Sequence, residues 1–287
     1  MKKIAVINDL SGFGKCSLTA AIPVISVLGA QCCPITTAVL SNQTGYEEYY
    51  CKDLTDEMPN IINGIKKLNT SFDGILTGFI SNARQGKIIA DFIDYFKTDS
   101  NIVVVDPVMA DDGKIYDCYD DACVDAIKGI AKKAQIITPN LTELCVLCDE
   151  DFNVVNSLSD NNKLCAVQLM CESVNRKSSE NVKIVVSGIH LSRNVIANAV
   201  FENGEFRTVE AKAVGGSFSG TGDILSSVIT AKCVSGESLY SAVVCATDFI
   251  SKAIEETIKA GNGRYNMADG VHFEKFLVEL GEKNEKS

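Results

Sequence analysis

Short runs of apolar, mostly β-branched residues alternate with longer amphipathic stretches through the first two thirds of the chain, and this alternation constrains the fold most strongly. A run such as Ile102-Val103-Val104-Val105 is apolar throughout, which is typical of a parallel strand covered by helices on both faces. Because parallel strands need long crossovers, the amphipathic stretches between them are predicted to be helices. The predicted strands are Lys3–Asn8, Cys32–Ala38, Gly74–Gly78, Ile102–Asp106, Gln135–Thr138 and Val182–Ser187. The predicted helices are Ser17–Leu28, Asp56–Leu68, Ala83–Phe96, Asp120–Lys133, Leu141–Cys148 and Ser159–Asn175.

The pattern changes in the last third of the chain. Two strand-like runs, Val195–Phe201 and Glu205–Ala211, flank Glu202-Asn203-Gly204, and Asn-Gly is a strong signal for a hairpin turn. Two long helices are predicted after them, at Gly222–Val234 and Ser238–Ala260. No linker, repeat or low-complexity tract divides the chain. We therefore expect one α/β domain over residues 1–287, with a mostly parallel sheet, helices on both faces and an antiparallel edge hairpin.

The charge of the chain narrows the classes of ligand. Its 27 Lys and Arg against 37 Asp and Glu give a formal net charge of −10, which repels polyanions and disfavours a nucleic-acid partner. A small anionic ligand remains compatible with this charge if backbone amides, a local lysine or a metal ion hold it. The apolar run after the first three residues is only Ile4–Ile7, too short for a signal peptide, and we expect neither a membrane span nor secretion. The expected location is the cytoplasm.

The 12 cysteines do not by themselves indicate a disulfide scaffold, because most lie in apolar segments where they act as small buried hydrophobes. Cys145 and Cys148 have the CxxC spacing of zinc sites, but no second pair or nearby histidine completes a tetrahedral set. Cys32 and Cys33 are adjacent in a strand and are expected on opposite faces of the sheet. The two histidines, His190 and His272, are interpreted as structural or surface residues.

Polar, small and acidic residues follow the predicted strands, and in an open parallel sheet ligands bind at the carboxyl ends of the strands. Each loop alone is compatible with ordinary turn chemistry, but their joint placement favours a site. The segment Gly12–Ser17 is not a Walker A loop, because Asp9 occupies the position of the first required glycine and Cys16 follows Lys15. It is not a dinucleotide fingerprint either, and we interpret it as a flexible glycine-rich turn between strand and helix.

The strongest single segment is Gly215–Leu225, where a glycine-rich turn leads directly into an apolar helix. The free N–H groups and the dipole of such a helix start stabilise negative charge, as an anion hole does. Asp223 stands at this point, where a carboxylate can accept a proton from an attacking hydroxyl. The alternative is that Asp223 only caps the helix, since Asp is a common cap.

Asn140 and Glu143 are three residues apart at the start of a predicted helix and therefore share a face. Together with Asp106 and Asp111 they are candidates for ordering water around magnesium, which prefers oxygen ligands and keeps several waters. The alternative is a polar cluster that only starts the helix.

Three motifs resemble the ribokinase-like superfamily: Gly220-Thr221-Gly222-Asp223, Pro139-Asn140-Leu141-Thr142-Glu143 and Asp106-Pro107-Val108-Met109. Within that superfamily, Leu40-Ser41-Asn42-Gln43-Thr44-Gly45-Tyr46 is similar to a segment of pyridoxal kinases. The resemblance runs from residue 1 to about residue 260, and it implies a three-layer sandwich that transfers the γ-phosphate of ATP to the 5′-hydroxymethyl group of pyridoxal, pyridoxine or pyridoxamine. It also implies magnesium, a monovalent cation such as potassium, and a homodimer.

The resemblance assigns roles to individual residues. Asp223 is implied to be the catalytic base, and Gly220, Thr221 and Gly222 the donors of anion-hole amides. The implied substrate contacts are Asp9, Ser11, Thr44, Tyr46 and Asp223. The implied nucleotide contacts are Asp106, Thr138, Asn140, Glu143 and Ser187, of which Asp106 and Glu143 would hold magnesium largely through water.

Two departures bear on the substrate. Many pyridoxal kinases carry serine where this chain has Asp9 and histidine where it has Gln43, and an aspartate at the first position is similar to hydroxymethylpyrimidine and sugar kinases. Many hydroxymethylpyrimidine kinases, however, use cysteine at the place of Asp223. The Ser41–Tyr50 stretch is too short for the full lid of a sugar kinase, and a vitamer-binding protein without catalysis would not need Asp223, Asn140 and Glu143 together.

Overall fold

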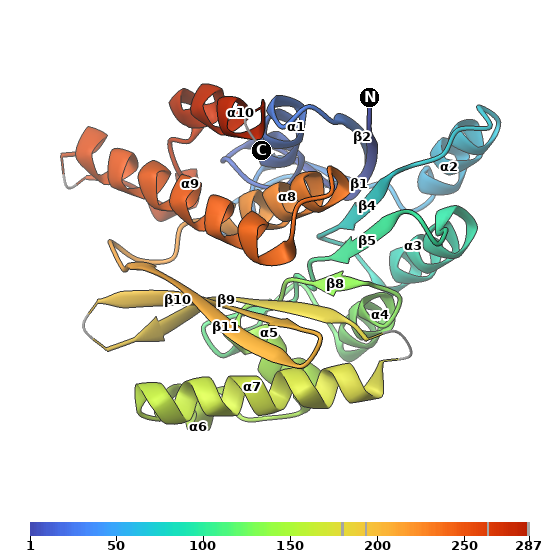
Figure 1. Ribbon diagram of the computed structural model, residues 1–287. Helices are drawn as coiled ribbons and strands as arrows, with labels where there is room; N and C mark the ends of the chain where they lie inside the picture. Colours follow the sequence, from blue (N-terminus) through green and yellow to red (C-terminus); the bar gives the residue numbers. More distant parts are fainter. Residues whose placement is uncertain (179–180, 193, 263, 286–287) are drawn as a thin grey trace.

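The computed structural model describes residues 1–178, 181–192, 194–262 and 264–285, and in these residues a nine-stranded sheet lies between two layers of helices (Figure 1). The strands are, in order across the sheet, β11 (Glu205–Lys212), β10 (Val195–Glu202), β9 (Lys183–Leu191), β8 (Ile136–Ile137), β5 (Ile102–Val105), β4 (Gly74–Thr77), β1 (Lys3–Phe13), β2 (Gln31–Asn42) and β3 (Cys51–Asp53). The strands from β9 to β2 run parallel, while β10, β11 and β3 pair antiparallel at the two edges. The α/β fold with a mostly parallel sheet and an edge hairpin is therefore confirmed.

Successive side chains of each strand point into different helix layers, as the pleat requires. Val103 and Val105 of β5 pack into one core, and Val104 packs into the other. The first core is covered by α2 (Met58–Lys66), α3 (Ala83–Phe96), α4 (Asp121–Ala131), α5 (Leu141–Cys148), α6 (Phe152–Asn156) and α7 (Asp160–Lys177). The second is covered by α1 (Ser17–Val27), α8 (Thr221–Val234), α9 (Leu239–Ala260) and α10 (Leu277–Glu285). Both faces of the central strands are thus buried, which is why these strands read as continuous apolar runs.

The ends of the first two strands differ from the prediction. β1 continues past Asn8 to Phe13, after a register shift between Asn8 and Leu10, and β2 continues to Asn42, which pairs with Phe13. The segment Gly12–Phe13 was expected to be a flexible turn and is instead strand, because β2 supplies backbone partners beyond the edge of the main sheet. We call the paired ends, residues 9–13 and 39–42, the β1–β2 extension.

Several short elements were not predicted. A two-stranded hairpin forms from β6 (Ala110–Asp111) and β7 (Lys114–Ile115), and the 3-10 turns η1 (Met267–Asp269) and η2 (Glu274–Phe276) precede α10. The chain after η2 forms α10 (Leu277–Glu285), and residues 286 and 287 lie outside the described residues. The helix start is anchored on the core, since Leu280 is buried and Gly281 packs against Val27 of α1.

The adjacent cysteines Cys32 and Cys33 lie on opposite faces of the sheet, as predicted, because each packs against a different core. Cys145 and Cys148 lie in the predicted helix α5 as free thiols. In the part of the chain that the structure describes, no helix combines the length and the hydropathy needed to cross a membrane.

Candidate active site

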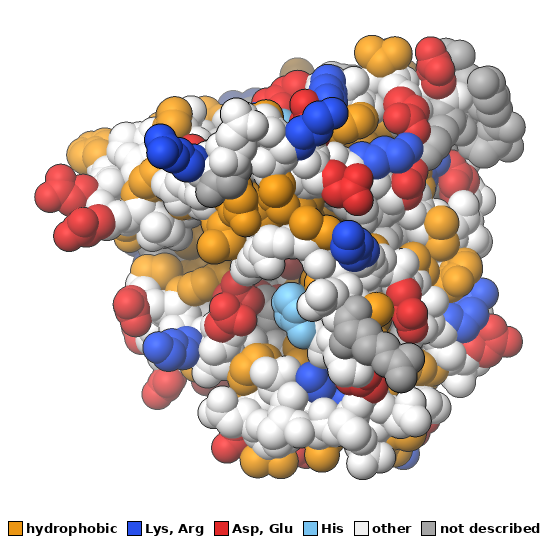
Figure 2. Space-filling view, turned by 90° about the vertical axis from the view of Figure 1, so that its left-hand side faces the viewer, with side chains coloured by type: hydrophobic (Ala, Val, Ile, Leu, Met, Phe, Trp, Pro, Cys, Tyr) orange, Lys and Arg blue, Asp and Glu red, His pale blue; other side chains and the backbone are white. Residues whose placement is uncertain are grey.

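A cavity of about 1020 Å³ opens at the carboxyl ends of the parallel strands. It extends from the β1–β2 extension across the start of α8 to the hairpin β10–β11 and the adjoining side of α9. Figure 2 shows the molecule hollowed on this side, with a histidine and acidic side chains around the opening. The cavity brings together the predicted site residues Asp9, Ser11, Thr44, Asp106, Thr138, Asn140, Glu143, Ser187, Gly220, Thr221, Gly222 and Asp223. Tyr46 does not line it.

The start of α8 lines the cavity. The turn before it can pack closely on the β1–α1 loop because Gly220 adopts a left-handed backbone conformation that favours glycine. Gly220 has φ +80, and a Cβ at this position would lie 1.9 Å from the carbonyl oxygen of Lys15. The turn therefore packs directly on the β1–α1 loop. Since the first N–H groups of a helix have no intrahelical acceptor, those of Thr221 and Gly222 are available to an anion in the cavity.

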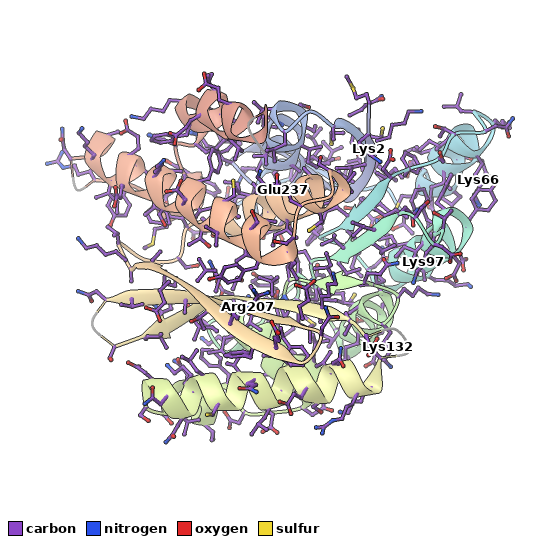
Figure 3. All side chains as sticks on the ribbon, viewed as in Figure 1. Lys2, Lys66, Lys97, Lys132, Arg207 and Glu237 are labelled. Atoms are coloured by element: carbon purple, nitrogen blue, oxygen red, sulfur yellow. The ribbon has the colours of Figure 1, made fainter. Side chains whose placement is uncertain are left out.

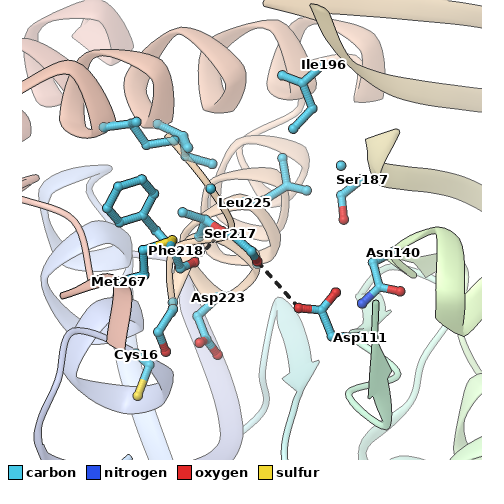
Figure 4. A pocket seen from close by; sticks show the side chains of 18 of the residues that line it. Cys16, Asp111, Asn140, Ser187, Ile196, Ser217, Phe218, Asp223, Leu225 and Met267 are labelled. Atoms are coloured by element: carbon cyan, nitrogen blue, oxygen red, sulfur yellow. Dashed lines mark hydrogen bonds between the residues drawn. The ribbon is translucent and has the colours of Figure 1, made fainter. Parts of the chain in front are cut away.

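Asp223 is partly exposed to this cavity, and the thiol of Cys16 lies near its carboxylate (Figure 4). Burial, with a smaller contribution from the nearby Asp9 carboxylate, raises its pKa to about 6, although hydrogen bonds from the Ser17 backbone and the Asn8 side chain act in the opposite direction. The Asn8 amide Nδ2 donates to Asp223 Oδ1 at 3.0 Å. Asp223 is in the first turn of α8, but Gly220 is the capping residue and the cap has no side-chain hydrogen bond. The simple capping interpretation of Asp223 is therefore wrong.

Asn140 and Glu143 form a reciprocal capping box at the start of α5. Asn140 Oδ1 accepts from the Glu143 N–H at 2.8 Å, and Glu143 Oε2 accepts from the Asn140 N–H at 2.8 Å. The other Glu143 oxygen accepts from the Met109 N–H, so Glu143 also holds the loop after β5. The helix-start alternative is confirmed for this pair, and burial together with the Asp106 carboxylate holds the pKa of Glu143 well above its usual range.

Asp106 lies within electrostatic reach of both Glu143 and Asp223. Burial raises the pKa of Asp106 to about 8, and the charge of Asp223 adds to this rise. Thr138, at the end of the neighbouring strand, has a buried hydroxyl without a hydrogen-bond partner among the described residues. The acidic pair and the unpartnered hydroxyl fit an ion held through water molecules. Among the residues that the structure describes, no three His, Cys, Asp or Glu side chains are grouped to chelate a metal ion directly.

The cavity has few basic groups. Of the described residues that line it, Lys212 is the only lysine or arginine, and Lys15 points away to form an ion pair with Glu274 at 2.8 Å. Lys2, Lys66, Lys97 and Lys132, labelled in Figure 3, precede strands of the sheet and so lie toward its amino edge, opposite the cavity. A phosphorylated ligand in this cavity must therefore be stabilised by backbone N–H groups and by a cation bound with it.

One end of the cavity is built on the β1–β2 extension. The Ser11 hydroxyl donates to Asp9 Oδ2 at 2.8 Å, and burial raises the pKa of Asp9. Tyr46 lies outside the cavity, where its hydroxyl donates to the carboxylate of Asp269 and its ring contacts Phe13 edge-on. Gln43 Nε2 donates to the Ala268 carbonyl at 3.0 Å, so the segment after β2 is attached to η1 at two places.

Sequence reasoning missed several cavity residues. Asn8 did not indicate a functional role, because asparagine is common where a strand leads into a turn. His190 was interpreted as structural or superficial, and the structure places it at the cavity lining. An apolar part of the cavity lies between the β10–β11 hairpin and the two long helices, and its residues are too far apart in sequence to form a motif. They are Ile196, Val209, Leu225, Val244, Ile250 and Ile254.

A mostly parallel sheet between two helix layers, with a glycine-rich helix start and a carboxylate at the strand ends, defines a kinase of the ribokinase-like type. The chain belongs to the phosphomethylpyrimidine kinase family, which it matches over residues 15–268.

Its relatives include both hydroxymethylpyrimidine and pyridoxal kinases. The chain is 29% identical to a hydroxymethylpyrimidine/phosphomethylpyrimidine kinase from Aquifex aeolicus, over 68% of this chain and 72% of that protein. It is 26% identical to a pyridoxal kinase from Aliivibrio fischeri, over 91% of each chain. It is 36% identical to a protein from Bacteroides thetaiotaomicron that is provisionally named a phosphomethylpyrimidine kinase and was crystallised with pyridoxal. That structure superposes with a TM-score of 0.89 and covers 97% of this chain and 95% of its own.

Proposed function

We propose that this protein phosphorylates the 5′-hydroxymethyl group of pyridoxal, pyridoxine or pyridoxamine with ATP, as a pyridoxal kinase of vitamin B6 salvage. The observation that carries the proposal is the pyridoxal bound by the Bacteroides relative, which is 36% identical over nearly the whole chain. The Asp223 carboxylate supports a base-assisted transfer to an alcohol, and the resemblance of residues 40–46 to pyridoxal kinases supports the pyridine ring as substrate.

Asp223 is the proposed base. With a pKa of about 6 it is mostly ionised at neutral pH, and it lies beside the N–H groups at the start of α8. A hydroxyl placed against this carboxylate transfers its proton to Asp223 as the oxygen attacks the γ-phosphorus. The proton thus goes to a carboxylate that burial, and to a smaller extent the nearby Asp9, has already made more basic than an ordinary aspartate.

The start of α8 is the proposed anion hole. The N–H groups of Thr221 and Gly222 point at the place where negative charge builds on the transferred phosphoryl group. The apolar part of the cavity beside α9 suits the base of the nucleotide, and it places the phosphates between that base and Asp223. Phosphoryl transfer needs little covalent help, so alignment and charge stabilisation supply most of the rate.

Magnesium is proposed to accompany ATP, because the cavity offers hardly any positive side chain to the triphosphate. Asp106 and Glu143 would hold the ion largely through water, and Thr138 offers an unpartnered hydroxyl beside them. When bound, the ion neutralises charge on the phosphate oxygens. Glu143 has a second function that needs no ion, since it fixes the Met109 N–H and the start of α5.

The second candidate is a hydroxymethylpyrimidine kinase. The family match and the Aquifex relative favour it, as does an aspartate at position 9. Both reactions transfer a phosphoryl group to a hydroxymethyl group on a planar ring with nitrogen, so the same base and anion hole serve either one.

The test is ATP consumption with magnesium and potassium, with pyridoxal, pyridoxine, pyridoxamine and hydroxymethylpyrimidine offered in parallel. Turnover of the pyridines supports vitamin B6 salvage, and turnover of the pyrimidine alone would contradict it. Asp223→Asn should lower kcat about 10²–10⁴-fold with little change in the KM for ATP, because an amide cannot accept the proton.

The matched control is Asp121→Asn, an aspartate in the first turn of α4 away from the cavity, which should keep wild-type kcat. Near-normal kcat in Asp223→Asn would remove Asp223 from the role of base. The mass of the same preparation in solution tests the homodimer that the family resemblance implies.

A further inference from the structure

Asn8 is a buried side chain at the end of the first part of β1, with only 4% of its surface exposed. Its Oδ1 accepts two backbone hydrogen bonds, from the Asp9 N–H at 3.0 Å and from the Phe79 N–H at 2.9 Å. Because these donors require an oxygen, they fix which end of the amide is which. The Nδ2 group is left on the opposite side, where it donates to Asp223 Oδ1 at 3.0 Å.

The surroundings of Asp223 make this hydrogen bond important. From β1 it faces Asp9, from the loop after β5 it faces Asp106, and from the β1–α1 loop it faces the Cys16 thiol. Tyr116, after β7, also lies within electrostatic reach. All four are acidic or neutral. Asp223 therefore has no cationic partner among the described residues. Hydrogen bonds from the Ser17 backbone and from the Asn8 amide hold its carboxylate, and of these two donors Asn8 is the side chain.

Space for Asn8 is provided by the neighbouring strand. A Cβ at Gly78, directly after β4, would lie 2.6 Å from Asn8 Nδ2 and 2.8 Å from Asn8 Oδ1. Gly78 is not in the left-handed region, so its backbone does not require glycine. The close approach of the Asn8 side chain is the reason that a larger residue does not fit.

We propose that Asn8 is a positioning residue for the transfer reaction, which holds the Asp223 carboxylate in the orientation that receives the substrate proton. This inference rests on the proposed function of Asp223 as base. Asn8 takes its own orientation from the backbone of β1 and of the loop directly after β4, and so connects the carboxyl ends of these strands to the first turn of α8. No part of this link passes through the substrate, so its loss should affect the reaction rate rather than substrate binding.

The test uses the full chain with two substitutions of Asn8. Asn8→Ala removes the amide, and Asn8→Asp keeps an acceptor for both backbone N–H groups but turns an oxygen toward Asp223. Each should lower kcat about 10- to 100-fold, the range for a hydrogen bond to a charged group, with the KM for vitamer and ATP within about twofold of wild type. A kcat within about twofold of wild type in both folded variants would overturn the proposal.

Gly78→Ala tests the same link without touching Asn8. The added methyl group should displace the Asn8 side chain and lower kcat in the wild-type background, and it should have no further effect in Asn8→Ala, where the space is empty. Equal, additive losses in the two backgrounds would contradict the proposal.

Asn101→Ala is the matched control. Asn101 is equally buried, and its amide bonds only backbone groups before β5, at the amino edge of the sheet. It should lower the melting temperature and leave kcat unchanged. If wild type turns over no vitamer and no pyrimidine, or if Asp223→Asn stays active, the proposed function fails; if Asp223→Asn is inactive and the Asn8 variants are normal, only this inference fails.

Discussion

The ionisation of Asp223 determines the pH at which the proposed reaction runs. Its carboxylate has a pKa of about 6 because it is buried beside another acidic group. A base must be deprotonated, so kcat/KM should fall about tenfold for each pH unit below about 6. The measurement is kcat/KM between pH 5 and 8 with saturating magnesium and ATP. An acid limb near the ordinary pKa of aspartate would show that another group limits the rate.

Asp9 should give this protein a different substrate preference from pyridoxal kinases that carry serine at the same position. Its carboxylate is buried, and burial raises its pKa. A cationic group on the substrate would favour the ionised form of Asp9 and form an ion pair with it. Asp9→Ser should therefore lower kcat/KM for pyridoxamine relative to pyridoxal by about tenfold, as expected for a hydrogen bond to a charged group. The three vitamers are compared side by side in wild type and variant, and an unchanged ranking would contradict this role.

At the scale of single residues, local signals predicted the site only where a residue acts with its sequence neighbours. Asn140 and Glu143 were recognisable because a capping box has a fixed spacing of three. Asp223 was recognisable because a glycine-rich turn precedes its helix. Asn8 was not recognisable, since its partners are 71 and 215 residues away in sequence.

At the scale of elements, the strand bodies were predictable and the strand ends were not. A strand such as β5 can be predicted from its own residues alone, because a strand that is buried between two helix layers must be apolar on both faces. The β1–β2 extension is different, because Phe13 is strand only through its pairing with Asn42. Such pairing depends on the register that the whole sheet imposes, and Gly12 and Gly14 indicated a turn instead.

The attachment of the segment after β2 to η1 should govern vitamer binding. The Tyr46 hydroxyl bonds Asp269, and the backbone of η1 also accepts from Ser219, beside the glycine-rich turn that starts α8. Tyr46→Phe should raise the KM for vitamer a few-fold, by about 0.5–1.5 kcal/mol of lost hydrogen bonding, with kcat within about twofold. Tyr50→Phe is the matched control, since its side chain is 67% exposed in the same segment. Equal KM values in the two variants would show that the attachment has no effect on binding.

At the scale of the whole molecule, acidic groups are concentrated where the fold least favours ionised carboxylates. Lysines that precede β1, β4, β5 and β8 lie near the amino ends of the strands (Figure 3), while Asp9, Asp106, Glu143 and Asp223 line the cavity at their carboxyl ends. The formal net charge of −10 adds to their mutual repulsion. In the free protein, Asp106 and Glu143 therefore favour their protonated forms, and a bound cation would favour their ionisation.

This arrangement predicts that the free protein loses stability as the pH rises. The pKa of Asp106 is about 8 in the folded protein against 3.8 in the unfolded chain, so between these pH values the folded state keeps a proton that the unfolded state has released. The stability that this proton provides is complete below 3.8 and is lost as the pH rises through about 8. In EDTA, the melting temperature should fall between pH 5 and pH 8, by about 2–4 °C for each kcal/mol lost, and should level off above pH 8. Asp106→Asn cannot ionise and should flatten this decline, whereas Asp125→Asn, an exposed aspartate on α4, should keep it. An equally steep decline in Asp106→Asn would show that the stability does not depend on the proton of Asp106.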